Sequence, residues 1–299
     1  MIKMKLLKIA SILILLLLTG CVDENTDDCP PKNNGSLKFS YLDFPEHIQR
    51  VDVGIFDKDG MFVESKLVEK NALEEFMGVY LNLDAGEYTA VCWGNAFENT
   101  RITNFEKNGL MDDGEVSHPY FGTENKIPTN DPLFYGVKKF TVKNNVVINE
   151  TVEFTPSHHK IHVYIKGLSV LTYAPSIEEY PVVRINSLAP TINFQNKTCN
   201  RKESYYPSVT IDNTKAIASA LTSVLLFEPE NDITVDVIEN ATANNILETV
   251  NLKEFIERNN IQFPEGKAVT IPILFEFKDG GKVEITVPEW GGSGIIPEM

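Results

Sequence analysis

The sequence predicts an all-β chain built from antiparallel β-sandwiches. Short runs rich in Val, Ile, Phe and Tyr are separated by Asn, Asp, Gly and Pro, and several runs alternate apolar with polar residues. Turn signals such as Asp59-Gly60 and Gly280-Gly281 separate pairs of these runs. Strands at regular spacing with polar turns between them are typical of sandwiches.

The first half of the chain predicts strands and hairpins in close succession. The run 50–65 is expected to be a hairpin that turns at Asp59-Gly60, and 79–95 a second hairpin that turns at Asp84–Gly86. Both faces of the last strand in 79–95 are apolar, with Tyr88, Ala90 and Cys92 on one face and Thr89, Val91 and Trp93 on the other, which places it inside a sandwich. Further strands are expected at 36–41, 133–142 and 145–156.

Residues 96–132 are irregular and longer than an ordinary connection, and such loops are usually functional or mobile. Beyond them we expect a strand at 159–168, a helix at 251–260 and a final hairpin at 268–290. The expected organisation is a signal peptide (1–20), a polar tether (21–35), an N-terminal sandwich (36–156) and a C-terminal sandwich (157–299).

The N-terminus has the layout of a secretory signal. Three lysines precede an aliphatic run that ends at Leu18, which is shorter than the roughly 20 apolar residues that span a bilayer. Leu18-Thr19-Gly20-Cys21 looks like a bacterial lipobox, so cleavage between Gly20 and Cys21 and lipidation of Cys21 are expected. An uncleaved N-terminal anchor and a chance cysteine are the alternatives.

The residues that follow Cys21 are acidic. Asp23, Glu24, Asp27 and Asp28 would repel an anionic leaflet, so they do not form a membrane-binding patch. In Bacteroides-like bacteria such residues resemble a signal for export to the outer face of the outer membrane. A solvated linker is the alternative interpretation.

Charge and motifs exclude several function classes. Removing residues 1–20 takes away three of the 27 basic residues and none of the 42 acidic ones, which leaves a formal charge of −18, so nucleic acid is not an expected partner. Nucleophile-elbow, phosphate-loop, dinucleotide and zinc-protease motifs are missing, so no enzyme activity and no cofactor are expected.

His158 and His162 are candidate ligands of a metal ion. A helix would bring these imidazoles together, but Val163, Tyr164 and Ile165 favour a strand, where the two histidines lie roughly 13 Å apart. No metal site is therefore expected there. Among the cysteines, a bridge between Cys29 and Cys199 remains open.

Three segments in order resemble one family. Asp28-Cys29-Pro30 after the lipobox, the hairpin Val51 to Gly60, and the strand Gly86 to Asn95 with its Trp-Gly-Asn ending are similar to the FimB-type fimbrial anchor lipoproteins of Bacteroides-like bacteria. The run 159–168 also looks like the opening strand of that family's second domain. The resemblance implies two tandem transthyretin-like β-sandwiches and no enzyme activity.

The resemblance also implies a function. It implies a minor subunit, lipid-anchored in the outer membrane at the base of a fimbrium, that holds the fimbrium through strand-addition contacts with a stalk subunit. We expect this chain to keep its first strand, because the lipobox is continuous with it, and to contribute its C-terminal end, residues 289–299, to the neighbour. The alternative is a surface glycan-binding lipoprotein, which predicts exposed aromatic pairs such as Tyr120-Phe121 or Tyr205-Tyr206.

Overall fold

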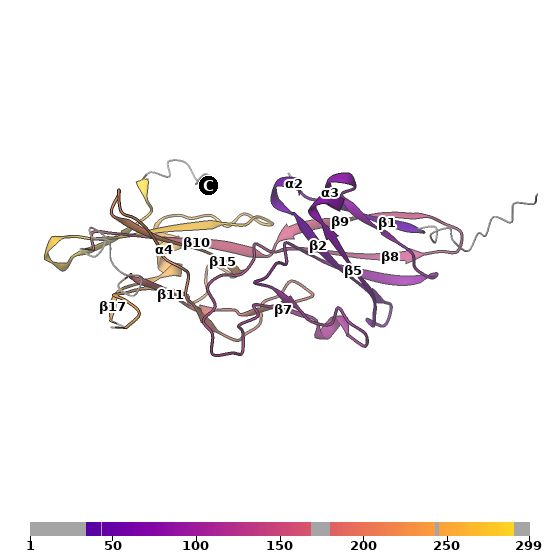
Figure 1. The fold of residues 1–299 in the computed structure, drawn as a ribbon, viewed down its shortest axis with the longest axis horizontal. Helices are drawn as coiled ribbons and strands as arrows, with labels where there is room; N and C mark the ends of the chain where they lie inside the picture. Colours follow the sequence, from indigo (N-terminus) through magenta and orange to yellow (C-terminus); the bar gives the residue numbers. More distant parts are fainter. Residues whose placement is uncertain (1–33, 43, 169–179, 243–244, 290–299) are drawn as a thin grey trace, which may run out of the picture. The chain divides into compact units, whose positions relative to one another are not determined.

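The computed structural model describes residues 34–289 except 43, 169–179 and 243–244. The first half contains a sheet of seven strands. They are β1 (Gly35–Ser40), β2 (Arg50–Asp57), β3 (Phe62–Glu69), β4 (Gly78–Leu81), β5 (Gly86–Gly94), β8 (Phe134–Val142) and β9 (Ile148–Pro156). Figure 1 labels five of them, β1, β2, β5, β8 and β9.

This seven-stranded sheet bends over to form both layers of a sandwich. Its strand order is β3-β2-β5-β8-β9-β1-β4, and all neighbours are antiparallel except β9 and β1, which are parallel. The pairing of β8 with β9 covers three residue pairs, so the sheet turns there. Side chains of β1 and β9 then share one core with those of β2 and β5, among them Leu37, Val53, Cys92 and Phe154.

The predicted hairpin at 50–65 is confirmed, whereas the predicted hairpin at 79–95 is wrong. Both strands of the latter exist, but β4 pairs with β1 and β5 lies between β2 and β8. Leu81 and Leu83 are buried, so the chain crosses from one layer to the other there instead of turning back on itself. The two apolar faces of β5 are confirmed, because Cys92 lies in the sandwich core and Trp93 in a second cluster on the outer face.

Two short helices accompany this sandwich. The helix α2 (Phe44–His47) follows β1, and α3 (Lys70–Glu75) connects β3 to β4. Leu73 on α3 is buried in the same core as Leu37, which holds the connection against the sandwich.

The second half is a two-sheet sandwich. One sheet has the order β14-β15-β10-β18-β19 and the other β13-β11-β16-β17, and their inner faces share a core that includes Ile161, Val235 and Phe275. The strands are β10 (His158–Lys166), β11 (Val182–Leu188), β13 (Glu203–Tyr205), β14 (Thr210–Asp212), β15 (Ile217–Leu225), β16 (Thr234–Ile238), β17 (Ile246–Asn251), β18 (Thr270–Phe277) and β19 (Val283–Thr286).

The expected helix and final hairpin of this half are confirmed. The helix α4 (Leu252–Arg258) begins at Asn251, whose side-chain oxygen accepts a hydrogen bond from the backbone N–H of Glu254 at 3.1 Å. The turn between β18 and β19 has Gly280 at φ 81° and Gly281 at φ 77°, backbone angles that glycine adopts without strain. The predicted all-β class with antiparallel sandwiches is therefore confirmed, with β10 and β18 as a parallel pair.

Most of the segment 96–132 has no helix or strand, as expected, but three short elements tie it to the rest of the fold. It contains β6 (Arg101–Ile102), the 3₁₀ turn η2 (Met111–Asp113) and β7 (Glu115–Ser117). These strands join β12 (Thr191–Asn193), from the second half, in a three-stranded sheet of order β12-β7-β6. The pairing partner is more than 70 residues away in sequence, so no local pattern of 96–132 reveals it.

Each half of the chain thus places a segment against the other. From the second half, Phe194 packs against Phe56 and Phe105 with ring centroids 5.9 and 5.1 Å away, and its carbonyl oxygen accepts a hydrogen bond from the Tyr135 hydroxyl at 2.7 Å. From the first half, the backbone N–H of Asn130 donates to the oxygen of Ser223 at 2.8 Å. The predicted division at 156/157 stays a prediction, and contacts cross it in both directions.

The core of the second half includes a buried imidazole. His159 is 5% exposed, its Nδ1 accepts a hydrogen bond from the backbone N–H of Val269 at 3.2 Å, and its ring contacts Phe227 and Phe263. Burial disfavours the charged form and lowers the pKa of His159 to about 4. Because the pKa is lower in the folded than in the unfolded state, this group's contribution is complete above about pH 6.5 and is lost as the pH falls toward 4.

We predict that replacing His159 with Gln flattens the acid limb of the stability profile. Between pH 7.5 and 4.5 the wild type should lose about 2–3 kcal/mol more unfolding free energy than His159→Gln, since one pKa unit corresponds to about 1.4 kcal/mol. Urea unfolding at both pH values measures this difference. Parallel pH profiles for the two proteins would contradict the assignment.

Candidate functional site

The sequence-predicted site residues lie outside the described part of the chain. These are Gly20, Cys21, Asp23, Glu24, Asp27 and Asp28. The structure does show where the chain enters the fold after these residues. It enters at Asn34, directly before β1.

Asn34 is bonded to the strands on both sides of β1. Its side-chain amide donates to the carbonyl oxygen of Leu83 and accepts from the backbone N–H of Leu83, the latter at 3.0 Å. Its backbone N–H donates to the oxygen of Leu81 at 3.0 Å, and its own carbonyl oxygen accepts from the N–H of Ile148 at 3.1 Å. The entry point of the chain is therefore fixed at β4 on one side and at β9 on the other.

The strand β1 is an integral part of the first sandwich. Leu37 is 0% exposed and Phe39 is 3% exposed, and the Phe39 ring meets the Phe154 ring edge to face at 5.5 Å. The Ser36 hydroxyl donates to the Asn149 side-chain oxygen at 2.7 Å. Because β1 is hydrogen-bonded along both of its edges, removing it would expose the core and open two unpaired strand edges.

Close backbone approach accounts for a glycine beside β1. A Cβ added at Gly78 would lie 2.3 Å from the carbonyl oxygen of Leu37, so only glycine allows β4 to approach this closely. The groove between β4 and β9 is therefore shaped to accept the first strand.

The histidine cluster behaves as the strand interpretation predicts. His158 and His162 both lie on β10, and the His162 ring stacks on Tyr164 with centroids 4.1 Å apart. Burial lowers the pKa of His162, which favours its neutral form. Within the residues that the structure describes, no three His, Cys, Asp or Glu side chains are grouped so that they could hold a metal ion.

No disulfide joins the two cysteines that the structure describes, Cys92 and Cys199. Cys92 is completely buried, and burial raises the pKa of its thiol, so its thiolate is suppressed. Cys199 is partly exposed. Cys29 lies outside the described residues, and its pairing with Cys199 stays a prediction.

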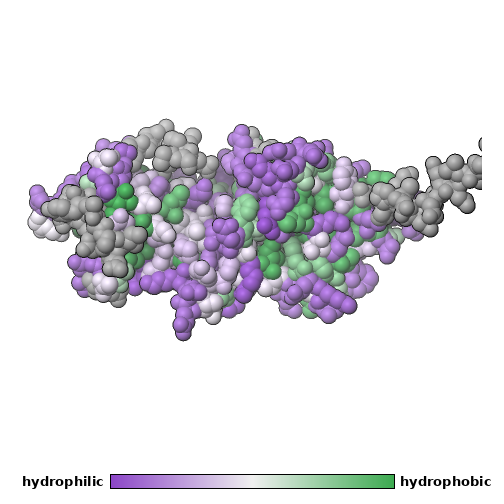
Figure 2. All heavy atoms as spheres, in the orientation of Figure 1, coloured by the Kyte–Doolittle hydropathy of each residue, from purple (hydrophilic) through white to green (hydrophobic). Residues whose placement is uncertain are grey.

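Of the aromatic pairs named for glycan stacking, Tyr205-Tyr206 is corrected by the structure. Tyr205 is 0% exposed, and its hydroxyl accepts a hydrogen bond from Asn130, so it is a core residue. Tyr120 is 43% exposed and Phe121 packs partly against the second core. On the face drawn in Figure 2, hydrophilic and hydrophobic residues are interspersed.

The sequence alone does not mark Asn34 as a functional residue. It is one of two consecutive asparagines at the end of a polar stretch, and only its position directly before Gly35 and the first alternating strand is a signal. Its bonding partners lie about 50 and 114 residues further along the chain, so its role comes from the fold.

This geometry defines a class of protein. It is a tandem β-sandwich in which the first strand pairs with β4 and β9 of its own chain. The chain belongs to the family of Fimbrillin-A associated anchor proteins Mfa1 and Mfa2, which it matches over residues 26–292. The recognised resemblance to fimbrial anchors is therefore confirmed, and with it the two transthyretin-like sandwiches. Among curated proteins, no sequence match was found.

Solved structures show the same fold. The fimbrial anchor protein Mfa2 from Porphyromonas gingivalis is 16% identical, with a TM-score of 0.60 over 84% of this chain and 94% of that one. A candidate adhesin from Bacteroides ovatus is 17% identical, with a TM-score of 0.65 over 85% of this chain and 93% of that one. Another from Bacteroides thetaiotaomicron is 15% identical, with a TM-score of 0.63 over 88% and 98%.

Membership of this family supports a structural role at the cell surface. The description of that family is of anchor proteins associated with fimbrillin A. In the described residues, no helix combines the length and apolarity needed to cross a bilayer.

We predict that Asn34→Ala loosens the first strand. The substitution removes both side-chain bonds to Leu83, which are partly buried. The loss of a hydrogen-bond partner costs about 1–3 kcal/mol where the remaining group is buried, so a cost toward the lower end of this range is expected. Amide hydrogen exchange of Leu37 and Phe39 should accelerate, and the free energy of unfolding should fall. The control is Lys38→Ala, which removes an exposed side chain of the same strand and should leave exchange unchanged. Equal exchange in both variants would contradict the role of Asn34.

Proposed function

We propose that this chain is a lipid-anchored minor fimbrial subunit, which attaches a fimbrium to the outer face of the outer membrane. The observation that carries the proposal is the seated first strand, which is separated from the lipobox cysteine by thirteen residues. A fully extended segment of that length reaches at most about 45 Å, so a lipid at Cys21 would hold the sandwich close to the membrane surface.

The lipid supplies the holding force in this proposal. Each buried methylene contributes about 0.8 kcal/mol, so two or three acyl chains on Cys21 anchor a protein where one chain would not. The acidic residues after Cys21 add no attraction to an anionic surface, which agrees with a role as an export signal instead.

Strand addition is the proposed mode of contact with the stalk subunit. In β-augmentation, main-chain hydrogen bonds supply affinity and alternating side chains supply register. Because β1 already fills the groove between β4 and β9, that groove is not open to a neighbour. The chain would therefore give a strand to the stalk subunit, and residues 289–299 are the proposed donor.

We predict that Cys21→Ala releases fimbriae from cells. Without the thiol no lipid is attached, so fimbriae should move from the cell-bound fraction to the medium while their total amount stays the same. Immunoblots of the two fractions measure this. Cys199→Ala is the matched control, since it removes a partly exposed thiol outside the lipobox and should leave fimbriae cell-bound. Retention equal to wild type in Cys21→Ala would overturn lipid anchoring.

Deleting residues 289–299 tests the donor role separately. The shortened chain keeps Cys21 and all of β19, so it should stay in the membrane fraction while fimbriae are shed. Normal fimbrial attachment by the shortened chain would show that the C-terminal end is not the donor.

A further inference from the structure

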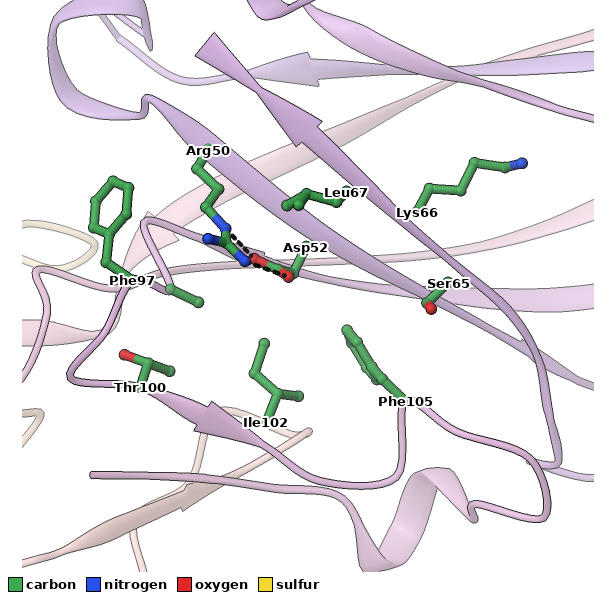
Figure 3. Close-up of a pocket in the computed structure, with 10 residues that line it drawn as sticks. Arg50, Asp52, Ser65, Lys66, Leu67, Phe97, Thr100, Ile102 and Phe105 are labelled. Atoms are coloured by element: carbon green, nitrogen blue, oxygen red, sulfur yellow. Dashed lines mark hydrogen bonds and ion pairs between the residues drawn. The ribbon is translucent and has the colours of Figure 1, made fainter. Parts of the chain in front are cut away.

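The outer face of the first sandwich contains a hollow that the anchoring role does not use. It lies between β2 and β3 on one side and the segment 96–105 on the other, and its volume is about 320 Å³ (Figure 3). Its lining combines charged, hydroxyl, aliphatic and aromatic side chains, contributed by Arg50, Asp52, Ser65, Lys66, Leu67, Ala96, Phe97, Thr100, Ile102 and Phe105.

An ion pair extends into this hollow. Arg50 Nε lies 3.1 Å from Asp52 Oδ2, and a second guanidinium nitrogen of Arg50 lies 3.4 Å from Asp52 Oδ1. The two side chains are 28% and 20% exposed, and Figure 3 shows both directed between the walls. Burial raises the pKa of Asp52 even beside this guanidinium, as expected for a partly desolvated pair.

The charge of this pair selects against ionic ligands. Arg50 and Asp52 neutralise each other, and the remaining charged residue of the lining, Lys66, lies 3.4 Å from Glu64, so each charged group of the lining has a partner of opposite sign. The two bonds use two of the five guanidinium N–H groups, and each carboxylate oxygen can accept further hydrogen bonds. Donors and acceptors therefore stand side by side, which suits neighbouring hydroxyl groups.

The opposite wall is held in place before any ligand arrives. Asp131 is 5% exposed and accepts hydrogen bonds from the backbone N–H of Phe97 at 2.8 Å and from the Thr100 hydroxyl at 2.6 Å. Phe105 rests on the backbone of β2, since a Cβ added at Gly54 would lie 2.3 Å from its ring. The aromatic and aliphatic lining is thus preorganised, which lowers the entropy cost of binding.

The same hollow is poorly suited to an added β-strand. Although β3 is an edge strand, Glu64 and Lys66 pair across with Ile55 and Val53, whose side chains lie in the core, so these two charges point inward. Lys66 Nζ lies 3.4 Å from Glu64 Oε2. Inward-pointing charges at an edge are a device that discourages pairing with another strand.

We propose that this hollow binds one ring of a neutral saccharide. The apolar C–H face of a sugar ring packs against Phe97, Ile102 and Phe105, and its hydroxyl rim bonds to the Arg50–Asp52 pair. The volume lies at the lower end of the range of small-ligand sites. This glycan-binding activity goes beyond anchoring and does not depend on the lipid or on strand addition.

Saturation-transfer NMR on the purified full-length chain in detergent tests the site. The probes are methyl α-mannoside, methyl β-galactoside and methyl N-acetyl-β-glucosaminide. At least one should bind, and Leu67→Glu should weaken that binding at least tenfold by placing a charge in the apolar wall. The matched control is Leu221→Glu, because Leu221 is 53% exposed and Leu67 is 50% exposed, but Leu221 lies on β15 outside the hollow. It should bind like wild type.

A second variant tests the charge argument. Asp52→Asn keeps the shape of the side chain but leaves the guanidinium of Arg50 unneutralised, so it should weaken neutral glycosides and strengthen binding of methyl glucuronide, an anionic sugar. A merely structural role of Asp52 would not produce this change of preference.

Three outcomes would overturn the proposal. They are no saturation transfer to any of the neutral glycosides, equal loss of binding in Leu67→Glu and Leu221→Glu, or cross-linking of a fimbrial subunit to the β3 edge in place of sugar binding. Fimbrial retention is measured in a separate assay, so failure of the saccharide site and failure of the anchor role are distinguishable.

Discussion

The seating of β1 between β4 and β9 is the contact on which the rest of the first sandwich depends. This strand completes the second layer, so Leu37 and Phe39 close a core that β2 and β5 alone would leave open to water. Asn34 fixes the strand at the end of the tether, where the chain enters the fold, with bonds to the strands on both sides. Asn34 and β1 therefore stabilise the first sandwich and also connect it to the segment through which we propose that it is attached to the membrane.

The two halves of the molecule are joined by more than the direct continuation of β9 into β10. The pairing of β12 with β7 and the packing of Phe194 bring the second half onto the outer face of the first, while Ile127 from the first half is buried in the core of the second. Such reciprocal contacts resist independent movement of the halves, because separating them would expose apolar side chains and unpaired backbone groups together.

The same contacts create the hollow proposed as a saccharide site. Segment 96–105 forms its wall because Asp131 holds the loop and β6 pairs with β7, which in turn pairs with β12. Anchoring and glycan binding would thus use different surfaces of one sandwich, with the first relying on β1 and the second on the outer face of β2 and β3. Families of surface proteins commonly carry different functions on one fold, so the site and not the fold must support each function.

The sequence by itself determined the all-β class, the strands from alternation of side chains, the helix α4 and the turns at Asp59-Gly60 and Gly280-Gly281, because these depend on residues a few positions apart. It also predicted that β5 is covered on both faces. Only the tertiary structure decided that β4 pairs with β1 instead of β5, that β7 within 96–132 pairs with β12, and that Asn34 and Asp131 hold their neighbours. Those outcomes depend on which distant strands together bury the most apolar surface, and a one-dimensional pattern specifies the face of a strand but not its partner.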